Sequence, residues 1–341
     1  MSRVLEEWLD EAEASLETGD PAHALECAEA ALALEPDHRD GLCLKATALT
    51  ELDRLEEADP LLDQLVQRFP KDAHVKLVAA NAKIRYDTEN RDRVEAGLDV
   101  LEGLERAKDE DVRFEALFLT GIGLSSLGEL EPALKALAAA LDIDPDAVDA
   151  RLEHATALFE CGRFDEAKRE LTQLTRDEPD EPLPWHYLGL IAEREKDEVA
   201  ARRFFEKAQR LDSEAYPEPV RLTDEEFDKA VADAIARLPE HAQKELGNVT
   251  ISVEPVPDDD ELKEGVSPLI LGVFVGTALD ERAPHVAEHH QTAMIKLFQR
   301  NLERFATSRD ELLQEIGVTL LHEVGHLLGL DEDELYERGL D

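Results

Sequence analysis

The pattern of apolar and polar positions divides the chain into a long helical region and a shorter mixed region. From about residue 5 to 215, small and apolar residues recur with a period of 34, and the prolines that close each run keep that spacing, Pro36 with Pro70 and Pro145 with Pro179. A 34-residue period is typical of stacked helix-turn-helix units. The pattern predicts about six such units in a right-handed solenoid.

The repeated units resemble tetratricopeptide repeats. The first unit carries the pattern at Trp8, Ala12, Gly19, Ala24, Ala31 and Pro36. The third unit, from about 73 to 108, loses it, and the 75 residues from Pro70 to Pro145 equal two periods plus seven. The sequence therefore predicts a longer loop around residues 85–92. The resemblance implies a groove that binds a protein partner or a peptide substrate.

The periodicity changes after a stiff segment that contains Pro217 and Pro219. Val249, Ile251 and Val253 alternate with polar residues, which is typical of a half-buried strand. The apolar run 269–275 predicts a strand buried on both faces, and 293–298 predicts a third strand. The expected fold is an all-α tetratricopeptide repeat solenoid followed by a small α+β domain, with a solenoid over 1–215, a linker over 216–222 and the second domain over 223–341.

A helix predicted near the end of the chain carries the strongest chemical motif. Ser308 and Glu311 have the spacing of a capping box, and the apolar residues that follow have helical spacing, at Leu312, Leu313, Ile316, Leu320 and Leu327. His322 and His326 are four residues apart on this helix, so both imidazoles can bind one metal ion. Glu323, beside them, has the position of a general base and acid.

A catalytic zinc ion has three protein ligands and one open position, so a third ligand must lie nearby. Gly329 is able to end the helix in a left-handed turn, after which Glu332 returns toward the metal. Glu332 is therefore the predicted third ligand. Asp331, Asp333 and Glu334 flank it, and the spacing does not exclude them.

The stretch from about 223 to 341 resembles the small zincin-like metallopeptidases of bacteria, which pair the motif HExxHxxG with an acidic third ligand. The matching segments are Asp224-Glu225-Glu226-Phe227, Arg237-Leu238-Pro239-Glu240, Asn248-Val249-Thr250-Ile251, Phe298-Gln299-Arg300-Asn301-Leu302-Glu303-Arg304 and Gly329-Leu330-Asp331-Glu332. The resemblance implies a minimal zincin fold, Zn²⁺ held by His322, His326 and Glu332, and catalysis by Glu323.

In zincins an edge strand beside the cleft pairs with the extended substrate, and the strand at 293–298 is the candidate for it. His285, His289 and His290 lie between the second and third predicted strands. His285 and His289 have the spacing of a second metal site. Because no helical pattern surrounds them, a loop over the cleft is the preferred interpretation.

The net charge of -43 narrows the classes of partner. Residues from 221 onward contribute -16 and the preceding ones -27, so acidity extends over both regions. Such a surface argues against binding to nucleic acid or to an anionic membrane.

The three cysteines, Cys27, Cys43 and Cys161, occupy helical apolar positions and are expected to be buried core residues. Without a signal peptide or a membrane-spanning run, a cytoplasmic location is expected.

The sequence thus predicts a zinc metallopeptidase in which a zinc-activated water cleaves peptide bonds with Glu323 as base and acid, while the repeats recruit the substrate or a partner. The alternative is a non-proteolytic repeat scaffold whose zinc domain is structural or regulatory. An open position on the metal would distinguish the enzyme from the scaffold.

Overall fold

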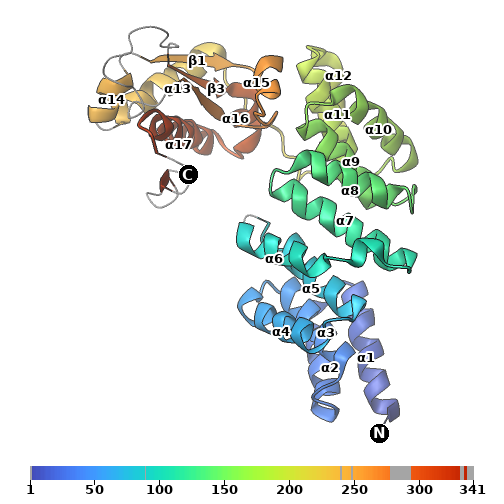
Figure 1. Cartoon of the computed structure of the whole chain (residues 1–341). Helices are drawn as coiled ribbons and strands as arrows, with labels where there is room; N and C mark the ends of the chain where they lie inside the picture. Colours follow the sequence, from blue (N-terminus) through green and yellow to red (C-terminus); the bar gives the residue numbers. More distant parts are fainter. Residues whose placement is uncertain are drawn as a thin grey trace. The chain divides into compact units, whose positions relative to one another are not determined.

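The computed structural model describes residues 2–88, 90–238, 240–246, 249–276, 293–330 and 334–335. The chain forms two compact units, Met1–Ala157 and Leu158–Asp341, and each is described by itself. Figure 1 labels their helices and strands.

The first unit is built from antiparallel helix pairs, which confirms the predicted helix-turn-helix repeat. Its helices are α1 (Ser2–Glu17), α2 (Pro21–Leu34), α3 (Arg39–Glu51), α4 (Leu55–Arg68), α5 (Ala73–Arg85), α6 (Arg91–Leu101), the short 3₁₀ helix η1 (Leu104–Arg106), α7 (Glu110–Ser126), α8 (Leu130–Leu141) and most of α9 (Val148–Glu160). Alanines such as Ala24, Ala46 and Ala58 are fully buried where the helices meet. Their small side chains let two helices approach closely while leucines fill the space between pairs.

A left-handed residue in the turn between the two helices marks each repeat. The backbone angle φ is positive at Gly19, Asp53, Asp87, Gly128, Gly162 and Lys196. The first three of these are 34 residues apart, as are the last three, so the period continues through the third unit as far as position 87. Glycine adopts this conformation without the steric cost that Asp and Lys carry.

The longer loop predicted around residues 85–92 is present. The connection from α5 to α6 spans 86–90, whereas the equivalent turns from α1 to α2 and from α3 to α4 span only 18–20 and 52–54. Further extra residues, which the sequence did not predict, lie in the connection from α6 to α7, which spans 102–109 and contains η1, whereas the connection from α4 to α5 spans 69–72.

The second unit joins the last repeat helices to a small α+β region. Its elements after α9 are α10 (Phe164–Asp177), α11 (Pro182–Arg194), α12 (Glu198–Leu211), α13 (Asp224–Arg237), α14 (Glu240–Leu246), β1 (Thr250–Glu254), α15 (Asp259–Lys263), β2 (Gly272–Val275), β3 (Met294–Phe298), α16 (Gln299–Phe305) and α17 (Arg309–Leu327). A capping box begins α13, because the Thr223 side chain accepts from the Glu226 amide and the Glu226 side chain accepts from the Thr223 amide.

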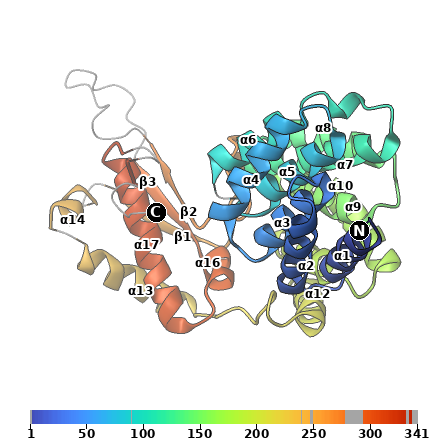
Figure 2. The ribbon, with the colours of Figure 1, turned by 90° about the horizontal axis from the view of Figure 1, so that it is seen from below.

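The sheet and two helices share one apolar core. In β3 the buried Ile295 and Leu297 alternate with the more exposed Met294 and Lys296, the two-residue period of a strand. Ile295 and Leu297 pack in one cluster with residues of α13 and α17, and α17 lies beside the sheet (Figure 2). On α17 the buried residues recur at helical spacing, at Leu312, Ile316, Leu320, Val324 and Leu327.

The order of the strands corrects the predicted edge strand. The order is β1-β3-β2, with β1 parallel and β2 antiparallel to β3. The strand predicted at 293–298 as the edge is therefore central, since it pairs on both sides. Of the described strands, β2 is the antiparallel edge strand that contacts α17. It is also shorter than predicted, and beyond Gly272 its residues are only half-buried.

Candidate functional site

Helix α17 places the two predicted histidine ligands on one face. Its first turn is capped by Ser308, whose side chain accepts from the Glu311 amide at 3.2 Å. The helix ends at Leu327, and Gly329 follows in the left-handed conformation with φ of 91°, as predicted. His322 and His326 are therefore one turn apart, close to the end of the helix.

The geometry of these two histidines fits a shared metal ion. Their Nε2 atoms are 3.1 Å apart, and the ring planes lie at 81° with centroids 4.7 Å apart. Two imidazoles bound to one tetrahedral zinc at 2.0–2.1 Å would have their nitrogens about 3.3 Å apart. The other nitrogen of His326, Nδ1, lies 3.1 Å from the carbonyl oxygen of Leu330. A hydrogen bond from Nδ1 to that oxygen leaves Nε2 available for metal binding.

Glu323 on α17 is buried, with 5% of its surface exposed, and faces the edge strand β2. A carbon atom added at Gly272 in β2 would lie 3.3 Å from Oε1 of Glu323 and 2.7 Å from Cγ2 of Thr319. The absence of a side chain at Gly272 therefore leaves room for the Glu323 carboxylate. The carboxylate therefore lies against the face of β2 on which a residue at position 272 would carry its side chain.

Glu332, the predicted third ligand, lies outside the described residues, as do Asp331 and Asp333. The residues on either side of them are described. Leu330 and Leu335 both approach Gly325 on α17, because a carbon added there would be 3.6 Å from Leu330 Cδ1 and 2.2 Å from Leu335 Cδ2. Leu335 is fully buried. Leu330 and Leu335 therefore both lie against α17, and Glu334 is half-buried.

Other predicted site features lie elsewhere. His285, His289 and His290 are outside the described residues. Cys27 and Cys43 are buried as expected, whereas Cys161 is partly exposed.

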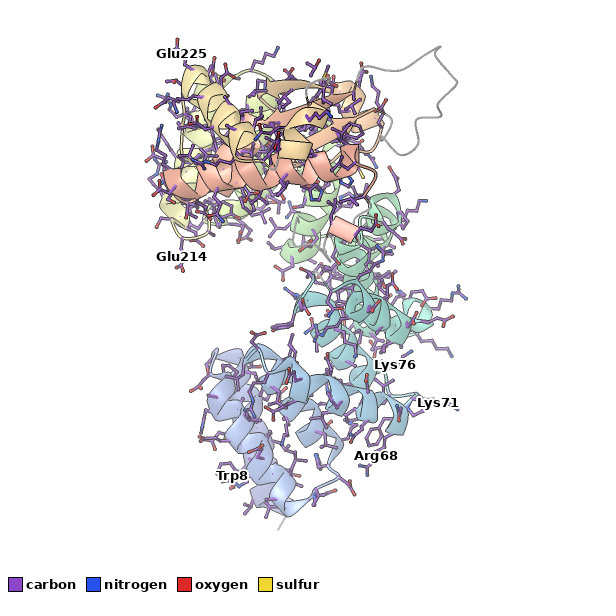
Figure 3. All side chains as sticks on the ribbon, turned by 90° about the vertical axis from the view of Figure 1, so that its left-hand side faces the viewer. Trp8, Arg68, Lys71, Lys76, Glu214 and Glu225 are labelled. Carbon is purple, nitrogen blue, oxygen red and sulfur yellow. The ribbon has the colours of Figure 1, made fainter. Side chains whose placement is uncertain are left out.

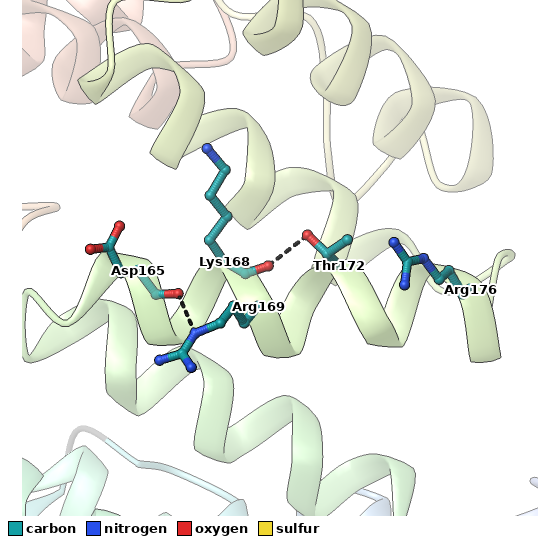
Figure 4. Close-up of a pocket in the computed structure, with 5 residues that line it drawn as sticks. All are labelled: Asp165, Lys168, Arg169, Thr172 and Arg176. Carbon is teal, nitrogen blue, oxygen red and sulfur yellow. Dashed lines mark hydrogen bonds between the residues drawn. The ribbon is translucent and has the colours of Figure 1, made fainter.

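A surface hollow on α10 is lined by Asp165, Lys168, Arg169, Thr172 and Arg176 (Figure 4). All five residues come from one helix, and two of their side chains bond to backbone carbonyls of the same helix, so the hollow is an open depression.

A cluster of buried charges joins α11 to α16. Glu193 on α11 forms an ion pair with Arg304 on α16, and its side chain is 6% exposed. Glu303, which is fully buried, pairs with Arg221 at 2.6 Å and with Arg300 at 3.2 Å. The pair between Glu193 and Arg304 holds α16 against the last repeat, and the pair between Arg221 and Glu303 holds the preceding segment against α16. The partners of these two pairs are 111 and 82 residues apart, so no local pattern reveals them.

His186 on α11 lies next to this charge cluster. Its ring packs against Phe205 and Tyr216 at centroid distances of 5.5 and 4.8 Å. Burial, and to a smaller extent the neighbouring Arg304, lowers its pKa to about 4. His186 is therefore a neutral packing residue near pH 7.

None of the helices that the structure describes combines the length and the apolar character needed to span a bilayer.

Two sequence families match parts of the chain. Residues 246–340 match the family of zincin-like metallopeptidases, and residues 15–82 and 125–191 match the tetratricopeptide repeat. These matches confirm the predicted fold class. The structure agrees with them, because a mostly helical region is followed by a small domain with a three-stranded sheet. Zincin-like proteins are generally zinc-dependent, and tetratricopeptide repeats generally mediate contacts between proteins.

Solved structures resemble the chain as well. PilF of Pseudomonas aeruginosa is 14% identical with a TM-score of 0.52, over 67% of this chain and 98% of that one. PilW, described as a widely conserved type IV pilus biogenesis factor, is 17% identical with a TM-score of 0.54, over 61% of this chain and 93% of that one. At these identities the likeness shows the helical repeat fold alone.

Proposed function

We propose that this protein is a zinc-dependent peptidase of the cytoplasm. It combines tetratricopeptide repeats with a zincin-like metallopeptidase domain, and the repeats recruit a protein substrate or partner. The metal ligands in this proposal are His322, His326 and Glu332, and Glu323 is the catalytic residue. The observation that carries the proposal is the 3.1 Å separation of the two Nε2 atoms beside the buried Glu323.

The residues of the site fit zinc, which when bound supplies a Lewis acid and a water of lowered pKa. Glu323 is placed to accept a proton from the attacking water and to deliver it to the leaving nitrogen. The Leu330 carbonyl orients the His326 ring through Nδ1. The backbone of β2 provides a free edge, among the described strands, for an extended peptide to pair with.

We also propose domain boundaries at 1–215, 216–222 and 223–341. The segment 212–223 contains no helix and separates α12 from α13, which supports a linker there. Arg221 and Leu222 in this segment bond to Glu303, so the linker is held against α16. The zincin-like match, which begins at residue 246, lies within the third proposed region.

Metal content and peptide cleavage, measured together, test the function. Wild type, His322→Ala and Glu323→Gln are compared for bound zinc and for cleavage of a mixed peptide library. We expect zinc loss at the α17 site in the first variant, zinc retention in the second, and cleavage by wild type alone. Zinc binding of this pattern with no cleavage by wild type would instead support the scaffold with a structural or regulatory zinc domain.

A further inference from the structure

Three side chains of the first helix pair form a cluster of potential metal ligands that is separate from the α17 site. Glu11 lies on α1, and His23 and Cys27 lie one turn apart on α2. One ligand atom from each lies within 4.8 Å of the other two. Nε2 of His23 is 3.3 Å from Oε1 of Glu11 and 3.6 Å from Sγ of Cys27.

These separations match ligands on one tetrahedral ion. Zinc binds thiolate sulfur at about 2.3 Å, imidazole nitrogen at about 2.0–2.1 Å and carboxylate oxygen at about 2.0–2.2 Å. Tetrahedral angles then place sulfur about 3.6 Å from nitrogen, and nitrogen about 3.3 Å from oxygen. Both observed distances agree, and both end on the same atom, Nε2 of His23.

A nucleophilic cysteine relay fits the cluster less well. In such a relay the thiol and the carboxylate contact opposite nitrogens of the imidazole. Here Cys27 and Glu11 contact the same nitrogen. Cys27 also has no exposed surface, so a peptide bond cannot reach its sulfur. A single ion, in contrast, can approach from the side of Glu11 and His23, whose side chains are 55% and 43% exposed.

The helix pair holds these groups in place before any ion binds. Asp20 caps α2 by accepting from the His23 amide at 3.0 Å, which fixes the start of the helix. Cys27 packs in an apolar cluster with Ala12, Ala28, Trp8 and Leu44, and Figure 3 labels Trp8 on α1. The contacts that pair α1 with α2 therefore also set Glu11 opposite His23, as a preorganised site requires.

The outer neighbours of His23 also suit a cation. Nδ1, the nitrogen that faces away from the cluster, lies 3.8 Å from Oε2 of Glu26. A carboxylate on the far side of a ligating imidazole is a common outer-shell arrangement because it orients the ring. A mixed set of sulfur, nitrogen and oxygen ligands favours zinc over Mg²⁺ or Ca²⁺, which prefer oxygen alone.

We propose that Glu11, His23 and Cys27 bind a zinc ion that cross-links α1 to α2 in the first helix pair. The fourth position on this ion is open to water or to a group from a partner. The ion stabilises the folded repeat because its ligands converge only when the two helices are paired. This site is independent of the proposed peptidase function.

Zinc content of the full chain tests the proposal in a background that lacks the α17 ligands. The double variant His322→Ala with His326→Ala is expected to retain one equivalent of zinc. Adding Cys27→Ala or His23→Gln should remove it, whereas adding Cys43→Ala, another buried cysteine, should not. His23→Gln alters a partly exposed side chain, so loss of folding does not explain its effect, and circular dichroism verifies this for each variant.

Cobalt substitution gives a second readout. A thiolate ligand to Co²⁺ produces a charge-transfer absorption band, and none of the α17 ligands contains sulfur. We expect this band in wild type and in Cys43→Ala, and its loss in Cys27→Ala. The proposal is overturned if the double histidine variant binds no metal, if Cys27→Ala keeps its zinc in that background, or if wild type shows no band.

Discussion

Gly272 on the edge strand β2 lies directly against Glu323 on α17, and Thr319 beside it leaves no room for a side chain at position 272. An added carbon would be 3.3 Å from Oε1 and Cγ of Glu323 and 2.7 Å from Cγ2 of Thr319. One glycine therefore determines how closely β2 approaches the proposed catalytic carboxylate.

We expect Gly272→Ala to lower peptide cleavage while zinc stays bound, because the new methyl group displaces β2 from α17 without removing a ligand. Overpacking of this kind costs about 1–3 kcal/mol of stability. Cleavage rate, zinc content and thermal midpoint are measured on the purified variant. The matched control is Gly317→Ala on α17, where an added carbon meets nothing within 4 Å. Equal activity in both variants would contradict this role of Gly272.

Substitution of Glu332 tests the third ligand. We expect Glu332→Ala to weaken zinc binding by more than the roughly 10- to 100-fold that loss of an outer-shell partner costs. Glu334→Ala serves as the comparison, because Glu334 lies next to the buried Leu335. Zinc affinity is measured by competition with a chelator. If Glu334→Ala loses zinc and Glu332→Ala keeps it, the ligand assignment is wrong.

The buried ion pair between Glu193 and Arg304 should contribute far more to stability than its exposed neighbour. Glu193→Ala leaves Arg304, with a side chain 11% exposed, without this carboxylate, a change that costs about 3–5 kcal/mol. Glu195→Ala is the matched control, because its pair with Lys168 is exposed and contributes at most about 1 kcal/mol.

The readouts for this pair are the urea midpoint and proteolysis of the segment 212–223. We expect Glu193→Ala to unfold at lower urea and to be cut faster in that segment, since Arg221 also lies 3.6 Å from Glu193. Similar midpoints for the two variants would show that the buried pair adds no special stability.

His186 should make the stability of the second unit depend on pH. Its folded pKa of about 4 lies below the ordinary value of 6.5, so protonation favours the unfolded chain. The neutral ring is fully compatible with folding above pH 6.5, and stability falls as the pH decreases from 6.5 toward 4. The loss approaches about 3 kcal/mol at the acid end.

The comparison with His186→Phe isolates this effect from the many carboxylates. Thermal midpoints of both proteins are measured between pH 7 and pH 4.5. We expect the wild-type midpoint to fall more steeply than that of the variant. Parallel curves would mean that His186 titrates as it does in the unfolded chain.

Local periodicity explains the parts of the fold that were predicted correctly. The 34-residue period and the buried alanines predicted the helix pairs, because each pair repeats the same short-range packing. The cap at Ser308, the spacing of His322 and His326 and the turn at Gly329 were predicted for the same reason, since they depend on the geometry of one helix and its ends.

The wrong predictions concern features that short-range patterns do not encode. The apolar run at 293–298 predicted a strand, but its position in the sheet depends on pairing with residues tens of positions away. The run 269–275 was predicted to be buried on both faces and Cys161 to be buried, but β2 beyond Gly272 and Cys161 are partly exposed, because burial depends on what other elements pack against each segment.

The sequence by itself determined the repeat architecture and the placement of two histidines and a glutamate on one helix, because backbone hydrogen bonding fixes which side chains share a face. Only the tertiary structure decided that β2 is the edge strand beside Glu323, that Glu193 and Glu303 are buried with arginines, and that Glu11 converges with His23 and Cys27. Each of these relationships joins different elements, and packing of the whole unit, not the local pattern, sets the distance between them.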